Sequence, residues 1–471
     1  MTPGTVLPRY GEATNKGKQL IEKDHLVRPT SGLEFVSSRH FPQEVQGDML
    51  INNTIGFLGT KQHKIWDSGT GYETKHRQDL VVGTDRNFRP VDMEFAPDGS
   101  LYLVDWHNIL IGHMQHNARD PLRDHVHGRI YRITYPSRPL VNPAKIDGAS
   151  IETLLSNLTL PEYRSRYRTR RELRARNAEE VLAKMDKWML SLDTKDANYE
   201  HHLLEGLWVS WGLNKVNQPL LKKLLSANDY RVRAAAVEVL RFNEHQVKNQ
   251  AEWLKQAASD DHPRVRLGAI VAASWLEKAK GRMVLEAAKM KTLDEWMVYA
   301  YETAVAHLNG VAVIKPKVVK KVETNLKGDD LALFSKGKEV YSKEGYCVTC
   351  HQADGNGLTA SGFPPLSGTE WVTGDQVRLV KVILKGLMGP IEVNGKQYEG
   401  MVPMTPFEGL SDDDVAAVAT YIRNSFGNTA SPIQSSFVKE VRATLSKKQS
   451  FYQSTKLLKM HPLESKMTKK G

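Results

Sequence analysis

Both cysteines of this 471-residue chain lie three positions apart, in the segment Cys347-Val348-Thr349-Cys350-His351. Three uses of such a pair are weakly supported. A disulfide across so short a loop would stabilise a fold little. A thioredoxin-like dithiol needs a βαβ setting, whereas helix-forming segments surround this motif. A zinc site needs four ligands, and the chain has no second pair of cysteines.

The histidine directly after Cys350 favours a fourth interpretation. Two thiols on one helical turn can add to the two vinyl groups of one haem, and the next side chain then lies against the iron. We therefore predict one covalently bound haem c, carried by Cys347 and Cys350, with His351 as an iron ligand.

The segments on either side of the motif fit this prediction. Residues 331–345, LALFSKGKEVYSKEG, place Gly337 and Tyr341 four positions apart. Residues 411–427, SDDDVAAVATYIRNSFG, begin with an N-cap serine and an acidic first turn, and carry Tyr421 on the apolar side. A glycine opposite an aromatic ring lets two helices cross closely. Residues 331–428 thus resemble the all-α class I cytochrome c fold, in which the first and last helices cross beside the haem.

This resemblance implies a methionine as the second iron ligand, in a proline-rich loop shortly before the last helix. The candidates are Met388, Met401 and Met404. Met404 fits best, because Pro403 and Pro406 stiffen its loop, whereas Met388 and Met401 also suit gap filling in a core. Ligation by His351 and Met404 would raise the reduction potential, suit electron transfer and leave no axial position open.

Two further residues fit the same resemblance. A proline carbonyl at Pro364 or Pro365 would accept a hydrogen bond from Nδ1–H of His351 and so fix the ring. Trp371 is similar in position to a residue that often hydrogen-bonds a haem propionate in such cytochromes. Packing in the core is the alternative role for Trp371.

Residues 1–140 alternate strand signals with turn signals. In PVDMEFAPDGSLYLVDW the pair Asp98-Gly99 predicts a hairpin turn between two strands. Hairpins at this spacing suit the blades of a β-propeller, but about three blades fit here and a closed propeller needs four to eight. We therefore expect a partial β-propeller, the C-terminal part of a larger one.

Residues 147–310 have helical periodicity and an internal repeat. Arg231-Val232-Arg233 returns as Arg264-Val265-Arg266, each time after an Asp-containing turn and before an Ala-rich helix. This pattern resembles a HEAT-like solenoid of stacked helix pairs. Such arrays are usually scaffolds. Residues 311–330, rich in lysine, are predicted to be a linker to the C-terminal domain.

The formal charge of +11 is concentrated in a basic C-terminal tail, residues 431–471, with nine Lys and Arg against two Glu. We expect a solvated surface with a loose end rather than a nucleic-acid site. A basic surface would also attract an acidic redox partner over a distance.

Histidines are concentrated in one N-terminal stretch, at His107, His113, His116, His125 and His127, with carboxylates at Asp105, Asp120 and Asp124. They could be metal ligands or face the centre of a propeller. The alternative is a long loop whose histidines bond the backbone and neighbouring acids. Their role stays open at this point, and this region is where we would look for a substrate or cofactor site.

Nearly the whole chain resembles a family of large planctomycete and verrucomicrobial proteins. The matching segments are APDGSLYLVDWHN and GHMQHNARDPLRDHVHGRIYRITY, a helical repeat region, and CVTCH with PMTPF and YIRNSFGN. Members join a sorbosone/glucose-dehydrogenase-like propeller to HEAT repeats and a C-terminal cytochrome c domain. The resemblance implies electron transfer from an associated propeller dehydrogenase to a redox partner or other acceptor.

Two alternatives remain from other functional classes. One is a quinoprotein-like sugar or alcohol dehydrogenase, active only as a longer protein with a complete propeller and a quinone or metal cofactor. The other is a HEAT-repeat scaffold that binds a protein. The sequence has no apolar run long enough to span a membrane and no secretory signal at its N-terminus. Since haem is attached to such proteins outside the cytoplasm, we expect a periplasmic or otherwise exported location and a chain that is part of a longer protein.

Overall fold

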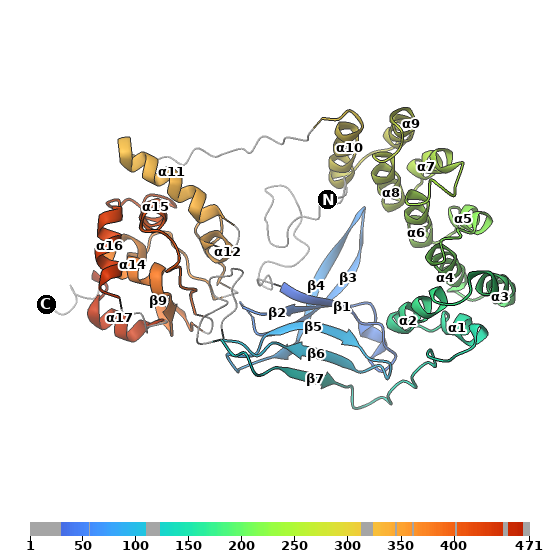
Figure 1. The fold of residues 1–471 in the computed structure, drawn as a ribbon, viewed down its shortest axis with the longest axis horizontal. Coiled ribbons are helices and arrows are strands. Elements are labelled where there is room, and N and C mark those ends of the chain that lie inside the picture. The colour runs from blue at the N-terminus through green and yellow to red at the C-terminus, as the bar shows by residue number, and fades with distance from the viewer. Residues whose placement is uncertain are drawn as a thin grey trace.

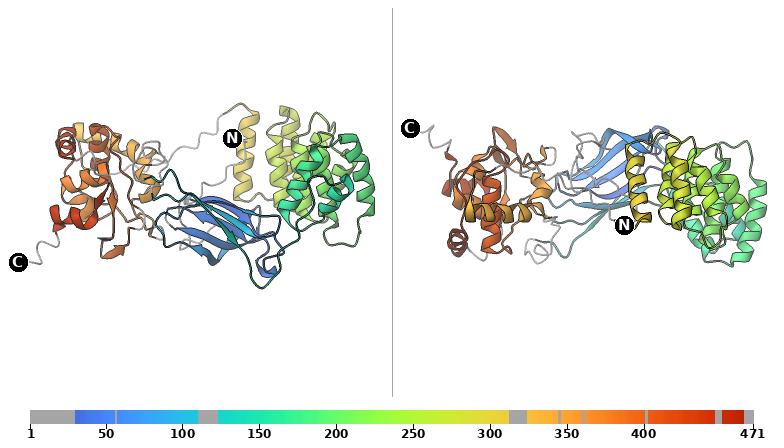
Figure 2. Two further views of the ribbon diagram at one scale, coloured as in Figure 1. Left: turned by 60° about the horizontal axis from the view of Figure 1, so that its bottom comes forward. Right: turned by 90° about the horizontal axis from the view of Figure 1, so that it is seen from above.

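The computed structural model describes residues 30–55, 57–109, 123–311, 324–343, 346–359, 362–400, 403–445 and 451–464. These residues form N-terminal antiparallel sheets, a helical middle region and a C-terminal domain (Figure 1). The sheets lie between the other two parts in every view (Figures 1 and 2). Within the described ranges, every helix is too short or too polar to cross a membrane.

The first sheet has four strands in chain order, each antiparallel to the next. They are β1 (Thr30–Phe35), β2 (Met49–Asn53), β3 (Gly59–Ser68) and β4 (Gly71–Val82), with a short 3-10 helix, η2 (Gln43–Val45), before β2. Strands β3 and β4 form a long hairpin that extends beyond the other two strands (Figure 1).

The second sheet is a three-stranded antiparallel meander of β5 (Pro90–Phe95), β6 (Leu101–Asp105) and β7 (Arg129–Ile133). The predicted hairpin is confirmed: Gly99 has a φ of 81°, and the side chain of Asp98 accepts hydrogen bonds from the backbone and hydroxyl of Ser100.

The two sheets share one apolar core, in which Leu50 of β2 meets Met93 of β5 and Leu101 of β6. Alternate residues along β6 are buried against this core, as expected for strands with one covered face. The described N-terminal residues form two open sheets and no closed barrel or propeller. Of the predicted partial propeller, the structure thus confirms the antiparallel sheets and does not show a propeller.

The middle region is an array of helices that pack side by side. They are α1 (Ile151–Asn157), α2 (Tyr163–Arg174), α3 (Ala178–Ser191), α4 (Tyr199–Gly212), α5 (Gln218–Leu224), α6 (Tyr230–Arg241), α7 (Gln250–Ala258), α8 (Pro263–Ala273), α9 (Lys278–Lys289) and α10 (Glu295–Leu308). Figure 1 shows them stacked along one curved row. Small residues such as Ala236, Ala269 and Ala273 lie fully buried in their common core, which lets the helices approach closely.

The sequence repeat has a structural basis in the turns before α6 and α8. Arg233 donates to the backbone carbonyls of Ala227 and Asn228, and Arg266, 33 positions later, donates to those of Asp260 and Asp261. An arginine at the equivalent position thus holds the equivalent turn in each of the two repeats.

The sheets are joined to the helical array by ion pairs at two places. Near the start of α2, a side-chain nitrogen of Arg39 lies 2.7 Å from a carboxylate oxygen of Glu162. Arg164 pairs in the same way with Glu34 at 2.6 Å. At the tip of the β3–β4 hairpin, Arg264 pairs with Asp67 at 2.9 Å. These ion pairs connect the sheets to the helical array near α2 and at α8.

The C-terminal domain begins with α11 (Gly328–Ser342), which starts slightly before the predicted boundary. Its further elements are α12 (Cys347–His351), α13 (Glu370–Thr373), α14 (Gln376–Lys385), β8 (Leu387–Met388), β9 (Ile391–Val393), β10 (Lys396–Tyr398), α15 (Asp412–Arg423), α16 (Ser435–Ala443), β11 (Tyr452–Gln453) and α17 (Ser454–Met460). Ser411 caps α15 as predicted, because its hydroxyl accepts a hydrogen bond from the backbone of Asp414.

Helices α11 and α15 cross in close contact, as the sequence predicted. A Cβ at Gly337 would lie 1.9 Å from the carbonyl oxygen of Ala417 and 2.7 Å from Cβ of Tyr421. Such contacts are far shorter than any real Cβ tolerates, so the crossing requires glycine. The ring centroids of Tyr341 and Tyr421 are then 5.2 Å apart.

The expectation of a loose basic tail is wrong for residues 431–445 and 451–464. Ile433 and Val438 are fully buried in the core of the C-terminal domain, and Leu457 is fully buried in a second small core. The apolar residues are spaced for one side of α16 and of α17, so the lysines and arginines occupy the other side.

We expect Gly337→Ala to lower the free energy of unfolding of the C-terminal domain by about 1–3 kcal/mol, the usual cost of overpacking. The gain in helix propensity, about 1 kcal/mol, does not offset a clash with backbone. Hydrogen exchange of the α15 amides measures the change. Gly409→Ala is the matched control, since nothing lies within 4 Å of a Cβ there. Equal exchange in the two variants would contradict the close crossing.

Candidate functional site

The motif Cys347–His351 forms α12, a short helix fixed to α11 by one buried tyrosine. The hydroxyl of Tyr341, which is 1% exposed, donates to the carbonyl oxygen of Gln352 at 2.6 Å. Gln352 has a φ of 63°, a left-handed conformation that ends the helix directly after His351. The position of the motif therefore follows from the packing of α11.

The surroundings of Cys347 argue against redox chemistry of this thiol. Neither cysteine of the motif is in a disulfide, and both are partly exposed. Burial raises the pKa of the Cys347 thiol to about 12, whereas a reactive thiolate needs a lowered pKa. Within the described ranges no group of three or more His, Cys, Asp or Glu side chains is arranged to hold a metal ion.

His351 is held in one orientation by the carbonyl predicted for this role. Its Nδ1 lies 2.9 Å from the carbonyl oxygen of Pro364. Since a carbonyl can only accept, Nδ1 carries the proton. Burial lowers the pKa of the imidazole, so the neutral ring keeps a lone pair on Nε2. That nitrogen has the form an iron ligand requires.

The loop after the motif turns back tightly because it contains glycines. The backbone N–H of Gly357 donates to the carbonyl oxygen of His351 at 3.1 Å. Gly357 has a φ of 66°, and a Cβ there would lie 2.4 Å from the carbonyl oxygen of Phe363. This approach brings Pro364 beside His351.

Met404 lies on a separate segment and is fixed through its backbone. Its N–H donates to the carbonyl oxygen of Leu387 at 2.8 Å, and its carbonyl oxygen accepts from the N–H of Leu387 at 3.3 Å. The side chain is partly buried. The alternative ligand Met401 lies outside the described residues. Met388 is in β8, where Gln453 Nε2 approaches its sulfur to 3.7 Å.

Two of the predicted haem-binding residues pack against one core. Cys347 and Met404 both pack, partly exposed, against the apolar cluster formed by α11, α14 and α15. The set consists of two thiols one helical turn apart, a neutral imidazole held by a carbonyl, and a thioether. These are the attachment and ligand types that a c-type haem uses, so the donor set fits this cofactor.

Trp371 has the alternative role considered above. Its side chain is 9% exposed and packs in a second core with Leu387 and Tyr398. The indole N–H donates to the carbonyl oxygen of Glu392 at 3.0 Å. The donor expected for a propionate is therefore used within the domain.

The N-terminal histidines are only partly brought together. Asp124 Oδ2 lies 2.7 Å from Nδ1 of His127 and 3.7 Å from Nε2 of His107. His125 is exposed, whereas His113 and His116 lie outside the described residues. Hydrogen bonds from the backbone of Val126 and His127, followed by the His127 side chain, lower the pKa of Asp124 to about 2. These contacts match the alternative in which the histidines bond neighbouring acids.

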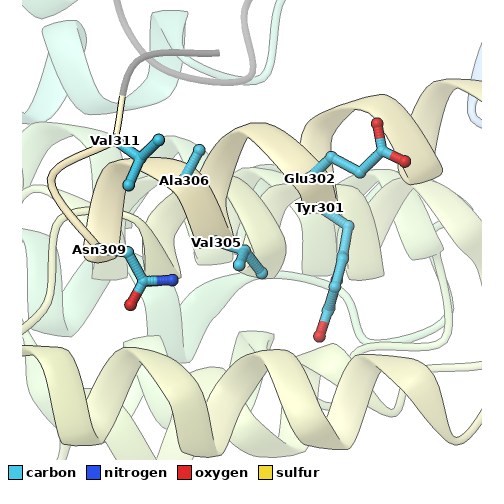
Figure 3. Close-up of a pocket in the computed structure, with 6 residues that line it drawn as sticks. All are labelled: Tyr301, Glu302, Val305, Ala306, Asn309 and Val311. Carbon is cyan, nitrogen blue, oxygen red and sulfur yellow. The ribbon is translucent and has the colours of Figure 1, made fainter.

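A shallow apolar hollow at the end of the helical array is a weaker candidate site. Figure 3 shows its lining residues, which belong to α10 and the residues directly after it: Tyr301, Glu302, Val305, Ala306, Asn309 and Val311. Asn309 already accepts a hydrogen bond from Arg282. The lining contains no Cys, His or Met, so it offers none of the side chains that attach a c-type haem or bind its iron in the site described above.

Two residues around Met404 were missed by the sequence reasoning. Gly386 and Leu387 follow α14 directly and position the Met404 backbone. The available signal was the glycine after the amphipathic stretch QVRLVKVILK, since glycine at a helix end predicts a left-handed residue. Gly386 has a φ of 72°.

Comparison with protein families divides the chain in the same way. Residues 6–137 match a domain of unknown function (DUF7133), residues 217–296 match HEAT repeats, and residues 334–426 match cytochrome c. The HEAT match confirms the solenoid prediction for part of the helical array. The cytochrome match contains the CVTCH motif and Met404.

Curated relatives resemble the C-terminal domain. Cytochrome c-552 of Thermus thermophilus is 35% identical over 116 residues, which are 23% of this chain and 84% of that protein. The fructose dehydrogenase cytochrome subunit of Gluconobacter japonicus is 30% identical over 103 residues, 21% of each chain. The cytochrome c subunit of a quinone alcohol dehydrogenase from Gluconobacter oxydans (strain 621H) is 32% identical over 127 residues, 25% of each chain.

The two dehydrogenase subunits are thus matched over about a quarter of their length or less, but most of the Thermus protein is covered. The family implies a haem c cofactor and electron transfer. Through its C-terminal domain, this chain belongs to the cytochrome c family.

Proposed function

We propose that the C-terminal domain binds one haem c through thioether bonds from Cys347 and Cys350 and passes single electrons between two redox partners. When bound, the haem supplies an iron that changes between Fe(II) and Fe(III). The observation that carries the proposal is the convergence of α12 and the Met404 segment on one core.

The chain's own residues have distinct tasks in this proposal. His351 would bind the iron through Nε2, because the Pro364 carbonyl keeps the proton on Nδ1. Met404 would supply the sulfur of its thioether as the second iron ligand. Such a ligand pair raises the potential and leaves no position for oxygen or a substrate, which favours electron transfer over catalysis at the iron.

A dehydrogenase is the electron donor that we propose. In support, two relatives are cytochrome subunits of dehydrogenases, by their names. The two N-terminal antiparallel sheets, stacked through one core, are compatible with blades of a dehydrogenase-like propeller, in which a quinone or a metal could be the cofactor. The HEAT-like array would then be a spacer and docking surface. Haem attachment through thioether bonds also favours a periplasmic or otherwise exported location.

The proposed activity is tested by a reductive titration of the haem-loaded chain, made with a haem-attachment system and exported. We expect one electron per chain and a fully reversible visible spectrum. Uptake of two electrons by the chain, or binding of carbon monoxide to the reduced wild-type protein, would contradict a six-coordinate electron carrier.

Loss of the thioether ligand should change the spectrum of the oxidised protein. We expect Met404→Ala to remove the weak absorption near the red end and to lower the reduction potential, because the sulfur no longer stabilises Fe(II). Met388→Ala is the control and should keep both properties. If the band survives Met404→Ala but disappears in Met401→Ala, Met401 is the ligand instead.

Each cysteine should contribute one bond to the haem. In Cys347→Ala or Cys350→Ala one vinyl group stays conjugated with the ring, so the reduced band in alkaline pyridine should move to longer wavelength. The double variant should release its haem into acidified organic solvent. A wild-type chain that releases its haem in the same extraction would refute covalent attachment.

A further inference from the structure

We infer that the last described segment, residues 451–464, is a clamp that positions Met404 for the iron; this inference rests on the function proposed above. The clamp contains β11 and α17. It follows residue 426, where the match to the cytochrome c family ends. It is therefore an addition to the matched part of the domain.

The clamp reaches Met404 through a shared strand. β11 pairs in parallel with β8, so that Tyr452 is opposite Leu387. The backbone N–H of Tyr452 donates to the carbonyl oxygen of Gly386 at 3.3 Å, while Leu387 exchanges both of its backbone hydrogen bonds with Met404. β8 is thus the middle strand between the clamp on one side and Met404 on the other.

Close contacts at Gly386 connect the same three segments. A Cβ on this residue would lie 2.2 Å from the carbonyl oxygen of Met404 and 2.9 Å from Cδ1 of Phe451. Phe451 is 8% exposed. The turn after α14 therefore packs tightly between the Met404 backbone and Phe451, the first residue of the clamp. A shift of Phe451 would thus change the packing against Gly386 and, through it, the position of the Met404 backbone.

The clamp also builds a second core behind Met404. Tyr452, Leu457 and Leu463 are buried there with Leu387, and the Met404 side chain packs against this core as well as against the main one. Further contacts fix the clamp itself. Ser454 donates to the carbonyl oxygen of Pro390 at 2.8 Å, and the buried Arg378 donates to those of His461 and Pro462.

This arrangement has a consequence for ligation. A thioether is a weak ligand, so the fraction of chains with sulfur on the iron depends on how far the Met404 segment is held in place. Anything that holds this segment in the bound geometry lowers the cost of ordering it and favours ligation. The clamp therefore has a positioning role in this inference, and no iron ligand is assigned to it.

The test uses the full chain with haem attached and three variants. Tyr452→Pro removes the N–H that bonds Gly386, and Gly386→Ala pushes directly on the Met404 carbonyl. Val438→Ala is the matched control, because it removes buried volume from α16, which belongs neither to the clamp nor to β8. We measure the weak red absorption of the oxidised protein, the affinity for imidazole, and, on the haem-free chain, hydrogen exchange at the Met404 amide.

We expect Tyr452→Pro and Gly386→Ala to weaken the red absorption and to tighten imidazole binding, while the haem stays covalently bound. Met404 amide exchange should be faster by about fivefold to tenfold, as for the loss of one ordinary hydrogen bond. Val438→Ala should lower the unfolding temperature and leave the absorption and the imidazole affinity unchanged.

Unchanged absorption and imidazole affinity in both clamp variants would overturn the inference, even if their stability falls. A control variant that loses the absorption to the same extent would also overturn it, since general destabilisation would then be the cause. A wild-type chain with covalent haem but without the red absorption would refute the Met404 assignment, and the clamp inference with it.

Discussion

The close crossing of α11 and α15 at Gly337 is the contact on which the candidate site depends. Because the α11 backbone rests on the carbonyl of Ala417, Tyr341 reaches both Tyr421 and Phe426, with ring centroids 5.2 Å and 5.4 Å away. The same tyrosine holds the end of α12 through Gln352. The place of the CVTCH motif is thus set by helix packing some ten residues earlier in the chain.

Much of this site could be predicted from short-range signals. The spacing of Cys347, Cys350 and His351 is a chemical requirement, and the Pro364 carbonyl and the Gly337 crossing follow from a resemblance that covers these positions. The hairpin at Asp98-Gly99 and the cap at Ser411 depend on local backbone preferences, which single residues reveal.

What could not be predicted depends on contacts between distant segments. Residues 431–471 were predicted to be a loose basic tail because their charge was counted without the helical periodicity of Ile433, Val438, Val441 and Leu457. The parallel pairing of β11 with β8 joins residues 65 positions apart and involves strands of two residues each, so no pattern in the sequence announces it. For the N-terminal region, the alternation of strand and turn signals predicted strands but could not predict how many sheets they form.

The protein combines two kinds of construction. The sheets and the helical array are joined by ion pairs of buried or half-buried carboxylates with arginines, as at Glu34 and Glu162. The C-terminal domain has two apolar cores of its own, and Met404 lies between them. A haem would thus be bound by a unit that has its own packing, and in the proposed function the other parts would set where that unit meets a donor.

The mass of the exported, denatured chain tests the central claim most directly. Covalent attachment predicts a mass increase of one haem, located on the peptide that contains Cys347 and Cys350, and no reaction of either cysteine with a thiol reagent. A chain of unmodified mass whose two cysteines both react, after export in cells that attach haem to a known c-type cytochrome, would contradict the account.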